Sequence, residues 1–337
     1  MTSTASPPRP GARIEIDSLS KSFGSFRAVD NLSFTVEPGV VTGFLGPNGA
    51  GKTTTLRMLL GLVRPSSGSA TIDGQTYRHL QHPQSMVGAA LEATNFHPGR
   101  SGRNHLRVLA AAGGFSDQRV DELLDLVGIP AAARKPAGGY SMGMRQRLGL
   151  AAALLGDPRV LIRDEPANGL DPEGIRWLRG FLRHLASEGK TILVSSHLLS
   201  EVEQTVDNVV ILANGRLVRQ GSIEELRGDD SVIVRSPDVE RLAQALDASR
   251  LDFVPLVAGG GLEVATTDLR AVGDLAFRAG VPIHELRVQH TDLEALFFRL
   301  TQAPENLNRN LEGGSAAEQS GSGAADQDVP SENEEVR

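Results

Sequence analysis

Cysteine is absent from this chain of 337 residues, and lysine is scarce, with four residues against thirty arginines. Without cysteine the chain forms no disulfide bond and offers no thiolate to a metal ion. Because lysine is so rare, each one is a candidate for a specific role, and one of them is Lys52. A hydrophobic content of 40% is enough for a sizeable core and, at this length, for two domains.

Long apolar runs are also missing. LGLAAALL, at residues 148–155, is among the longest, well short of the ~20 apolar residues of a membrane-spanning helix. The N-terminal stretch MTSTASPPRPGAR is polar and proline-rich, without the apolar segment of a signal peptide. We therefore expect an intracellular protein whose role at a membrane depends on a partner.

The negative charge is unevenly distributed. Of the formal net charge of −7, residues 302–337 carry −6, which leaves −1 for the rest of the chain. No broad basic surface is implied, so nucleic acid is not expected as a partner.

Composition and hydrophobic pattern divide the chain into four parts. We expect residues 1–11 to be disordered. Residues 12–228 alternate short β-rich runs, such as VVTGFL and TILV, with helical patterns, which predicts an α/β domain with a largely parallel sheet. Residues 229–301 read as βαββαβα, the pattern of a small ferredoxin-like α+β domain whose last helix spans 291–300. Residues 302–337 are predicted to be a disordered acidic tail.

The stretch GPNGAGKTT, residues 46–54, fits the pattern G-x-x-x-x-G-K-[ST] at every fixed position. It follows an apolar run and opens a helical one, the context that this P-loop pattern needs. The glycines let backbone N–H groups turn towards phosphate oxygens, and the helix N-terminus adds partial positive charge. Lys52 would reach the β- and γ-phosphates, and the Thr53 hydroxyl would bind Mg²⁺. The residues expected to contact the nucleotide are Gly46, Asn48, Gly49, Gly51, Lys52, Thr53 and Thr54.

A P-loop alone indicates only a nucleoside triphosphate, because kinases, GTPases and motor ATPases all carry one. The stretch YSMGMRQRLGLAAALLGDPRVLIRDEPANGLDP, residues 140–172, narrows the choice. Together with the P-loop it resembles the ATP-binding subunit of ABC transporters over roughly residues 13–228. Within that family the chain is most similar to antibiotic- and lantibiotic-exporting subunits, which pair with a separate membrane protein and often carry a similar small C-terminal domain.

The resemblance implies a P-loop NTPase core with a helical subdomain, ATP and Mg²⁺ as ligands, and ATP hydrolysis that powers export of a drug, antibiotic or other small molecule. In this family an ATP is sandwiched between the P-loop of one domain and the signature motif of another. A chain with one of each therefore implies a dimer with a second copy or a paralogue. The dimer would act on a polytopic membrane subunit, at the cytoplasmic face of the cell membrane, through the helical region around residues 93–140.

The resemblance also assigns residues that contact the nucleotide outside the P-loop. Phe23, in SKSFG, matches the aromatic residue that stacks on adenine, and Phe26 is a substitute. Glu92 stands where most of the family has the glutamine that senses the γ-phosphate and the metal, and the exporter subgroup often has glutamate there. Ser141 and Gly143 match the signature motif.

The signature motif departs from the usual one at Tyr140, Met142 and Met144, which replace its Leu, first Gly and Gln. Ser141 is a good helix N-cap, and a helix that begins there would direct N–H groups and its dipole at a phosphate. Met142 adds a side chain where glycine allows close approach, although the exporter subgroup commonly has serine, an apolar residue, glycine and methionine in this order.

The chemistry is implied by four further matches. Asp164 matches the carboxylate that holds Mg²⁺ through water, and Glu165 matches the general base that polarises the attacking water. His197, after the strand TILVSS, matches the histidine that contacts the γ-phosphate, so that Lys52 and His197 stabilise its charge. Asp171, in GLDP, matches a loop that contacts the other subunit.

Arg163 is an unexpected residue in the run VLIR, residues 160–163, which otherwise reads as a buried parallel strand and should be apolar. Side chains alternate along a strand, so Val160, Ile162 and Asp164 share one face, and Leu161 and Arg163 share the other. We expect Arg163 to point away from the metal site, with its head in solvent or beside a carboxylate. The alternative is that the charge of Arg163 lowers the pKa of Glu165 or repels Mg²⁺, and so slows hydrolysis.

Two other kinds of ABC ATPase remain open: an importer subunit, and a soluble ATPase that acts on ribosomes or DNA. Soluble members usually carry two cassettes in one chain, long coiled coils or zinc-binding cysteines, and this sequence has none of them. A nucleotide kinase would have no use for the signature stretch or Asp171.

Overall fold

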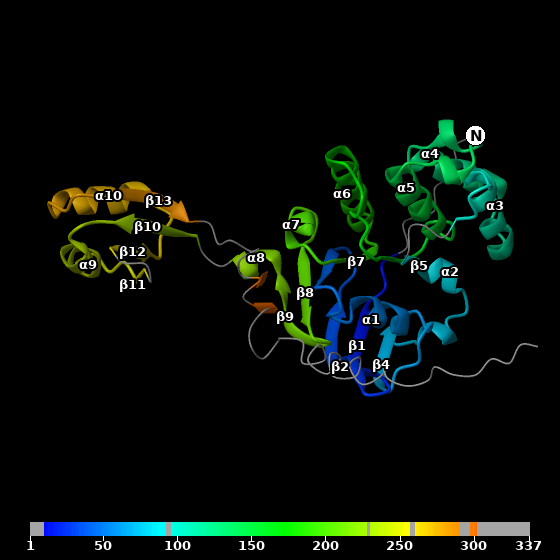
Figure 1. Cartoon of the computed structure of the whole chain (residues 1–337), viewed down its shortest axis with the longest axis horizontal. Coiled ribbons are helices and arrows are strands. Elements are labelled where there is room, and N and C mark those ends of the chain that lie inside the picture. Colours follow the sequence, from blue (N-terminus) through cyan, green and yellow to red (C-terminus); the bar gives the residue numbers. More distant parts are fainter. Residues whose placement is uncertain are drawn as a thin grey trace, which may run out of the picture.

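The computed structural model describes residues 10–91, 96–227, 230–256, 260–289, 297–298 and 300–301. It forms a larger α/β part, residues 10–227, and a smaller part, residues 230–289, which lies to one side of it (Figure 1). Within these residues, no helix combines the length and apolar character needed to cross a bilayer.

A six-stranded sheet runs through the larger part, in the order β5-β6-β7-β3-β8-β9. The strands are β5 (Val87–Ala90), β6 (Val160–Arg163), β7 (Thr191–Ser196), β3 (Val41–Leu45), β8 (Asn208–Ala213) and β9 (Arg216–Ser222). All neighbours are parallel except β9, which pairs antiparallel with β8. The predicted, largely parallel sheet is confirmed, and its apolar runs are buried on both faces, as such sheets require.

A second sheet is antiparallel and covers one side of the first. Its order is β2-β1-β4, from β1 (Ile14–Phe23), β2 (Phe26–Val36) and β4 (Ser67–Ile72). Side chains from this sheet, from helix α1 (Lys52–Leu59) and from one face of the six-stranded sheet, such as Ile14, Leu56 and Ile162, form one core. The other face of the large sheet, including Leu161, belongs to a different core with the remaining helices.

Three helices form a subdomain beside β5: α3 (Gly102–Gly113), α4 (Asp117–Leu126) and α5 (Met142–Ala153) (Figure 1). Ser101, Ser116 and Ser141 each cap one of them, accepting a hydrogen bond from a backbone N–H in the first turn. A Cβ added at Gly88 of β5 would lie 2.0 Å from the carbonyl oxygen of Ala153, so the end of α5 almost touches the sheet edge.

Helix α6 (Pro172–Ser187) is the next helix after β6 and packs on the large sheet through Leu178, Phe181 and Leu185. The shorter helices are η1 (Tyr77–His79), α2 (Pro83–Met86), η2 (Pro130–Ala132), η3 (Ala137–Gly139), α7 (Leu199–Val202) and α8 (Ile223–Arg227).

The smaller part is a four-stranded antiparallel sheet with two helices. Its elements follow one another as β10 (Ser231–Arg235), α9 (Val239–Ala248), β11 (Phe253–Pro255), β12 (Gly261–Val264), α10 (Leu269–Arg278) and β13 (Glu285–Gln289). The strand order β11-β12-β10-β13 confirms the predicted ferredoxin-like βαββαβ arrangement. Val232 and Val234 pack against Leu242 and Val272 of the helices, in a core of its own.

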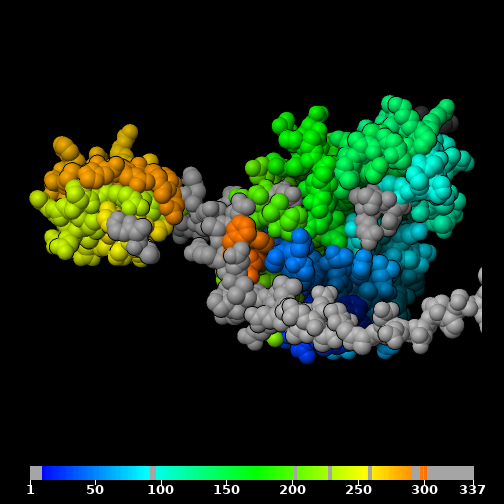
Figure 2. Space-filling view, in the orientation of Figure 1, coloured from blue at the N-terminus to red at the C-terminus, as the bar shows by residue number. Residues whose placement is uncertain are grey.

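The helix predicted at 291–300 lies mostly outside the described residues. Phe297, Phe298, Leu300 and Thr301 are described, and all four are helical. Phe297 is buried in a core of the larger part, the one that contains Ile223 and Leu226 of α8, and Figure 2 shows these terminal residues in orange against the larger body. The chain thus leaves the larger part after α8 and contacts it again beyond β13.

Candidate active site

The P-loop connects β3 to α1 and is confined by the backbone around it. A Cβ at Gly46 would lie 2.5 Å from the Leu212 carbonyl oxygen, and one at Gly51 would lie 2.5 Å from that of Ala28. Gly51 also has a φ of 96°, a conformation that L side chains rarely adopt. The two glycines therefore allow the loop to curl tightly beside β2 and β8, with the N-terminus of α1 behind it.

Lys52 is folded back across this loop. Its Nζ donates hydrogen bonds to the carbonyl oxygens of Gly46, at 2.6 Å, and Pro47, at 3.3 Å, and lies 3.5 Å from Glu165 Oε1. The side chain is only 6% exposed. Burial lowers the pKa of Lys52, and the carboxylates of Glu165 and Asp164 oppose that shift. The ammonium group is thus held over the loop and beside two carboxylates.

Asp164 follows β6 and is bound from two sides. Thr53 Oγ1 on α1 donates to its Oδ2 at 2.8 Å, and Ser195 Oγ on β7 donates to its other oxygen. The Asp164 N–H donates to the Ala90 carbonyl oxygen at the end of β5, at 3.2 Å. Two elements therefore hold the carboxylate, and a third holds the backbone of Asp164.

Glu165 is the next residue, with a φ of 47°, in the left-handed region that non-glycine residues seldom occupy. Its N–H donates to Ser195 Oγ at 2.9 Å, and its Oε2 lies 2.8 Å from His197 Nδ1, just beyond β7. An ionised carboxylate can only accept, so His197 Nδ1 carries the proton of this hydrogen bond. The backbone turn aims Glu165 between Lys52 and His197.

Ser195 was not predicted from the sequence, although it contacts both carboxylate residues. The sequence feature that could have indicated Ser195 is the pair of serines at the end of TILVSS, because a buried strand would otherwise remain apolar. The side chain is fully buried, and its hydroxyl accepts from Glu165 N–H while it donates to Asp164. Ser195 thereby ties the two carboxylate residues to β7.

The signature residues lie elsewhere on the surface. Ser141 caps α5 as predicted, and its Oγ accepts from the Met144 N–H at 3.3 Å. The hollow beside it is lined by Ser141, Met142, Gly143, Met144, Arg147, Gly169, Asp171, Glu173 and Gly174. Asp171 also caps α6, accepting from the Gly174 N–H at 2.8 Å. No P-loop residue lines this hollow in the described structure, so one chain does not bring its P-loop and its signature together.

The remaining sequence-predicted residues come from several segments of the chain. Phe23 and Phe26 face each other across the turn between β1 and β2 and are 51% and 41% exposed, so either ring is accessible for stacking. Asn48 is exposed in the loop, and Thr54 is half-buried in the first turn of α1. Glu92 lies outside the described residues, so its predicted metal contact stays a prediction.

The expected orientation of Arg163 is right, but its expected surroundings are wrong. Val160 and Ile162 lie in one core and Leu161 in the other, so Arg163 does point away from Asp164. Its head, however, reaches neither solvent nor a carboxylate among the described residues. The side chain is 1% exposed, and its Nη2 donates to Gln146 Oε1 on α5. The reason is that α5 covers this face of the strand, so the side chain ends inside the protein.

The oxygen atoms beside the P-loop fit a Mg²⁺ ion bound together with a nucleoside triphosphate. The Thr53 hydroxyl and the Asp164 carboxylate are hard oxygen donors, which Mg²⁺ prefers, and they already touch each other. The described residues contain no group of three or more His, Asp or Glu side chains placed to hold a metal by themselves. The Thr53 hydroxyl as a ligand, with Asp164 acting through a water, would suit a Mg²⁺ ion that otherwise keeps phosphate oxygens and waters.

Comparison with known proteins identifies two regions. The profile of the family described as ABC transporter matches residues 29–168, and a domain of unknown function matches residues 230–294. A solved structure of the ATP-binding subunit of an ABC transporter superposes with a TM-score of 0.58 and 29% identity, over 64% of this chain and 91% of that one.

Three relatives illustrate the sequence similarity. The uncharacterized ABC transporter ATP-binding protein YhcH of Bacillus subtilis (strain 168) is 37% identical over 293 residues, which are 86% of this chain and 95% of the relative. The bacitracin transport ATP-binding protein BcrA of Bacillus licheniformis is 42% identical, over 64% of this chain and 71% of the relative. The Nod factor export ATP-binding protein I of Burkholderia lata is 38% identical, over 71% and 82%.

The similarity to YhcH extends over nearly that whole protein, beyond the P-loop and through the smaller part. Along this length the chain keeps a P-loop, two carboxylates at the end of a buried strand and a capped signature helix. The chain belongs to the ATP-binding subunits of ABC transporters, a family of ATPases.

Proposed function

We propose that this subunit hydrolyses Mg-ATP at the site formed by Lys52, Thr53, Asp164, Glu165 and His197, and powers export of an antibiotic or similar small molecule through a separate membrane subunit. The observation that carries the proposal is the placement of Glu165 between Lys52 and His197, at 3.5 and 2.8 Å. The names of the relatives, which concern bacitracin transport and Nod factor export, support an exported small molecule as the cargo.

In the proposed reaction Glu165 accepts the proton of the attacking water. His197 holds the second oxygen of Glu165, so that Oε1 stays turned towards Lys52. Lys52, already held over the P-loop, exchanges its carbonyl contacts for the β- and γ-phosphates. Thr53 and Asp164 would hold Mg²⁺, which when bound neutralises charge on the transferred phosphate.

We also propose that two copies of the chain complete each other's sites. Ser141 and Gly143 lie at the start of α5, at a surface hollow that is separate from the P-loop of the same chain. The exposed N-terminus of a helix with a serine cap suits a phosphate group. A second chain would place its signature hollow over the nucleotide held by the P-loop of the first.

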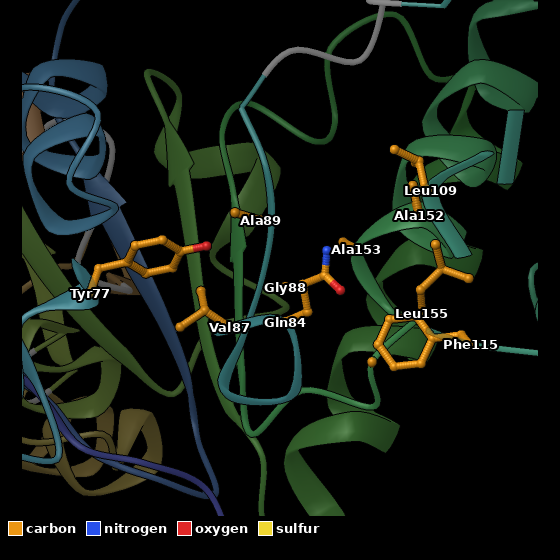
Figure 3. A pocket seen from close by; sticks show the side chains of 11 residues that line it. Tyr77, Gln84, Val87, Gly88, Ala89, Leu109, Phe115, Ala152, Ala153 and Leu155 are labelled. Carbon is orange, nitrogen blue, oxygen red and sulfur yellow. The ribbon is translucent and has the colours of Figure 1, made fainter. Parts of the chain in front are cut away.

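The membrane subunit is proposed to bind the groove between β5 and the helical subdomain, at the cytoplasmic face of the membrane. Figure 3 shows this groove, a cavity of about 260 Å³ lined by apolar side chains such as Val87, Leu109 and Leu155. Leu109 on α3 lines this groove and is 37% exposed, so its side chain is accessible to a partner. Leu109→Arg is expected to weaken co-purification of the membrane subunit without lowering the intrinsic ATPase rate.

The substitution Glu165→Gln tests the proposed chemistry. It keeps the size and the contact with His197 but removes the base, so we expect kcat for ATP hydrolysis to fall about 10²–10⁴-fold. Binding of ATP to the full chain should persist, because Lys52 and the P-loop are unchanged. Glu122→Gln, on the exposed side of α4, is the matched control and should hydrolyse ATP at the wild-type rate. Unchanged hydrolysis in Glu165→Gln would contradict the proposal.

A further inference from the structure

A buried arginine connects the catalytic strand to the signature helix. Arg163 is the last residue of β6 and directly precedes Asp164 and Glu165. Its Nη2 donates to Gln146 Oε1, in the second turn of α5, and this helix begins at Ser141. Burial lowers the pKa of Arg163 to about 10, so the guanidinium stays charged at neutral pH. A buried hydrogen bond thus joins two elements that carry functional residues.

Stability does not account for this arginine. Its Nε and Nη1 atoms are buried and find no hydrogen-bond partner in the described structure. A buried charge with one neutral partner is expensive, and an apolar side chain of similar size would be equal or better for stability. Gly149 of α5 faces the guanidinium, and a Cβ there would lie 3.4 Å from Nη1, at van der Waals contact.

Gln146 extends the connection to the loop beyond Glu165. Its Nε2 donates to the Asn168 carbonyl oxygen at 3.5 Å, and the Asn168 N–H donates back to the Glu165 carbonyl oxygen at 3.2 Å. One amide side chain of α5 therefore contacts both ends of the catalytic segment: the residue before the carboxylates, and the turn that follows them.

We propose that Arg163 is a positioning residue which, through Gln146, keeps the signature helix α5 aligned with the catalytic strand β6. When Glu165 and its loop respond to the nucleotide in one chain, this contact turns Ser141 and Gly143, which complete the site of the second chain. The inference rests on the proposed function of these residues and adds a physical link between the two sites. Hydrolysis and dimer closure are coupled by this link.

The test compares Arg163→Met, Arg163→Lys and the wild type, each as the full chain. Methionine fills the volume without a charge, so the unfolding midpoint should hold or rise. We expect kcat to fall about tenfold in Arg163→Met, which is equivalent to a rise of about 1.4 kcal/mol in the activation free energy. The affinity for ATP should stay within about twofold. Arg163→Lys keeps a positive charge and a hydrogen-bond donor but loses the planar guanidinium group. Its kcat should therefore lie between those of the wild type and Arg163→Met.

Gln146→Leu provides an independent variant. It leaves Arg163 charged with no acceptor, so both the unfolding midpoint and kcat should fall. In the double variant Arg163→Met and Gln146→Leu, the midpoint should recover, while kcat stays at the level of Arg163→Met, because the two residues form one contact. Arg119→Met is the matched control. Arg119, on α4, donates a hydrogen bond of 3.0 Å to the Leu154 carbonyl oxygen, at the other end of α5. Loss of this hydrogen bond should lower the unfolding midpoint but leave kcat unchanged.

The outcomes separate this inference from the proposed function. Equal kcat values in the wild type, Arg163→Lys and Arg163→Met would overturn it and make Arg163 a packing residue. A weakened affinity for ATP with unchanged kcat would overturn it as well, because the P-loop would then be the affected part. If instead Glu165→Gln hydrolyses ATP as fast as the wild type, the proposed function itself is wrong.

Discussion

The two parts of the molecule use charged side chains in opposite ways. In the larger part, Asp164 and Glu165 are partly buried, and side chains from α1, from β7 and from the residue after β7 hold them. In the smaller part, Glu285 pairs with Arg235 at 3.0 Å and with Arg287 at 2.7 Å, all on an exposed sheet face. Exposed pairs contribute little, whereas the buried contacts fix orientation. The difference places the proposed chemistry in the larger part, whereas the smaller part is held together by a core of its own.

The largest effect is expected from Asp164→Asn. The amide loses the negative charge that would hold Mg²⁺, so kcat should fall at least about 10²-fold, the scale of several kcal/mol of charge stabilisation. The rate is measured over a range of Mg²⁺ concentrations. Asp157→Asn, which alters a surface partner of Lys190, is the control and should keep the wild-type rate. A wild-type rate and Mg²⁺ dependence in Asp164→Asn would show that the carboxylate has no role at the metal.

A smaller effect is expected from Ser195→Ala. Its hydroxyl binds Asp164 and Glu165 N–H, and its loss should misplace both carboxylates and lower kcat about tenfold, for one to two lost hydrogen bonds. Ser187→Ala, which removes a hydroxyl at the exposed end of α6, is the control. If both variants hydrolyse ATP equally fast, the contacts of Ser195 are structural only.

A substitution in the core of the smaller part should leave hydrolysis almost unchanged. Leu242 is fully buried between α9 and the sheet, and Leu242→Ala should destabilise this part by about 2–5 kcal/mol. Hydrogen exchange of residues 231–289 should rise, while kcat stays within about twofold, because these residues have a separate core. A kcat loss comparable to that of Ser195→Ala would remove the contrast between the two parts.

The smallest effect concerns pH and His105, on α3. Burial, with a contribution from Arg100, lowers the pKa of His105, whose ring packs edge-on against Phe96 at 4.7 Å. The unfolded chain therefore binds the proton more readily, and the free energy of unfolding falls as the pH drops below about 6.5. His105→Gln should make the unfolding midpoint less sensitive to pH between about 7 and 5. Parallel curves for variant and wild type would contradict this assignment.

The P-loop, the two carboxylates and His197 were predictable because each follows a buried strand of a parallel sheet. The ends of such strands meet at one edge, so linear motifs translate directly into neighbours in space. The ferredoxin-like order of the smaller part was predictable for a similar reason, since its alternating strands and helices follow one another without interruption.

The surroundings of Arg163 and Ser195 were not predictable from the sequence. Strand alternation gave the correct face for Arg163, but its burial depends on α5, which packs there through Gln146 and Gly149. Ser195 lies inside an ordinary strand, and only the register that places β7 beside β6 brings its hydroxyl to Asp164. Both features arise from contacts between distant segments, which hydrophobic periodicity does not contain.

The proposed dimer, in which two chains complete each other's ATP sites, is tested by the oligomeric state of the full-length Glu165→Gln variant in light scattering. We predict a monomer without nucleotide and a dimer with Mg-ATP, because bound ATP persists in this variant. Adding Gly143→Asp places a negative charge in the signature hollow. A Cβ at this position would make only an ordinary contact of 3.6 Å with Leu170, so the fold should tolerate the side chain. The added charge should abolish the dimer while ATP still binds. A Glu165→Gln chain that binds ATP yet remains a monomer would contradict the claim.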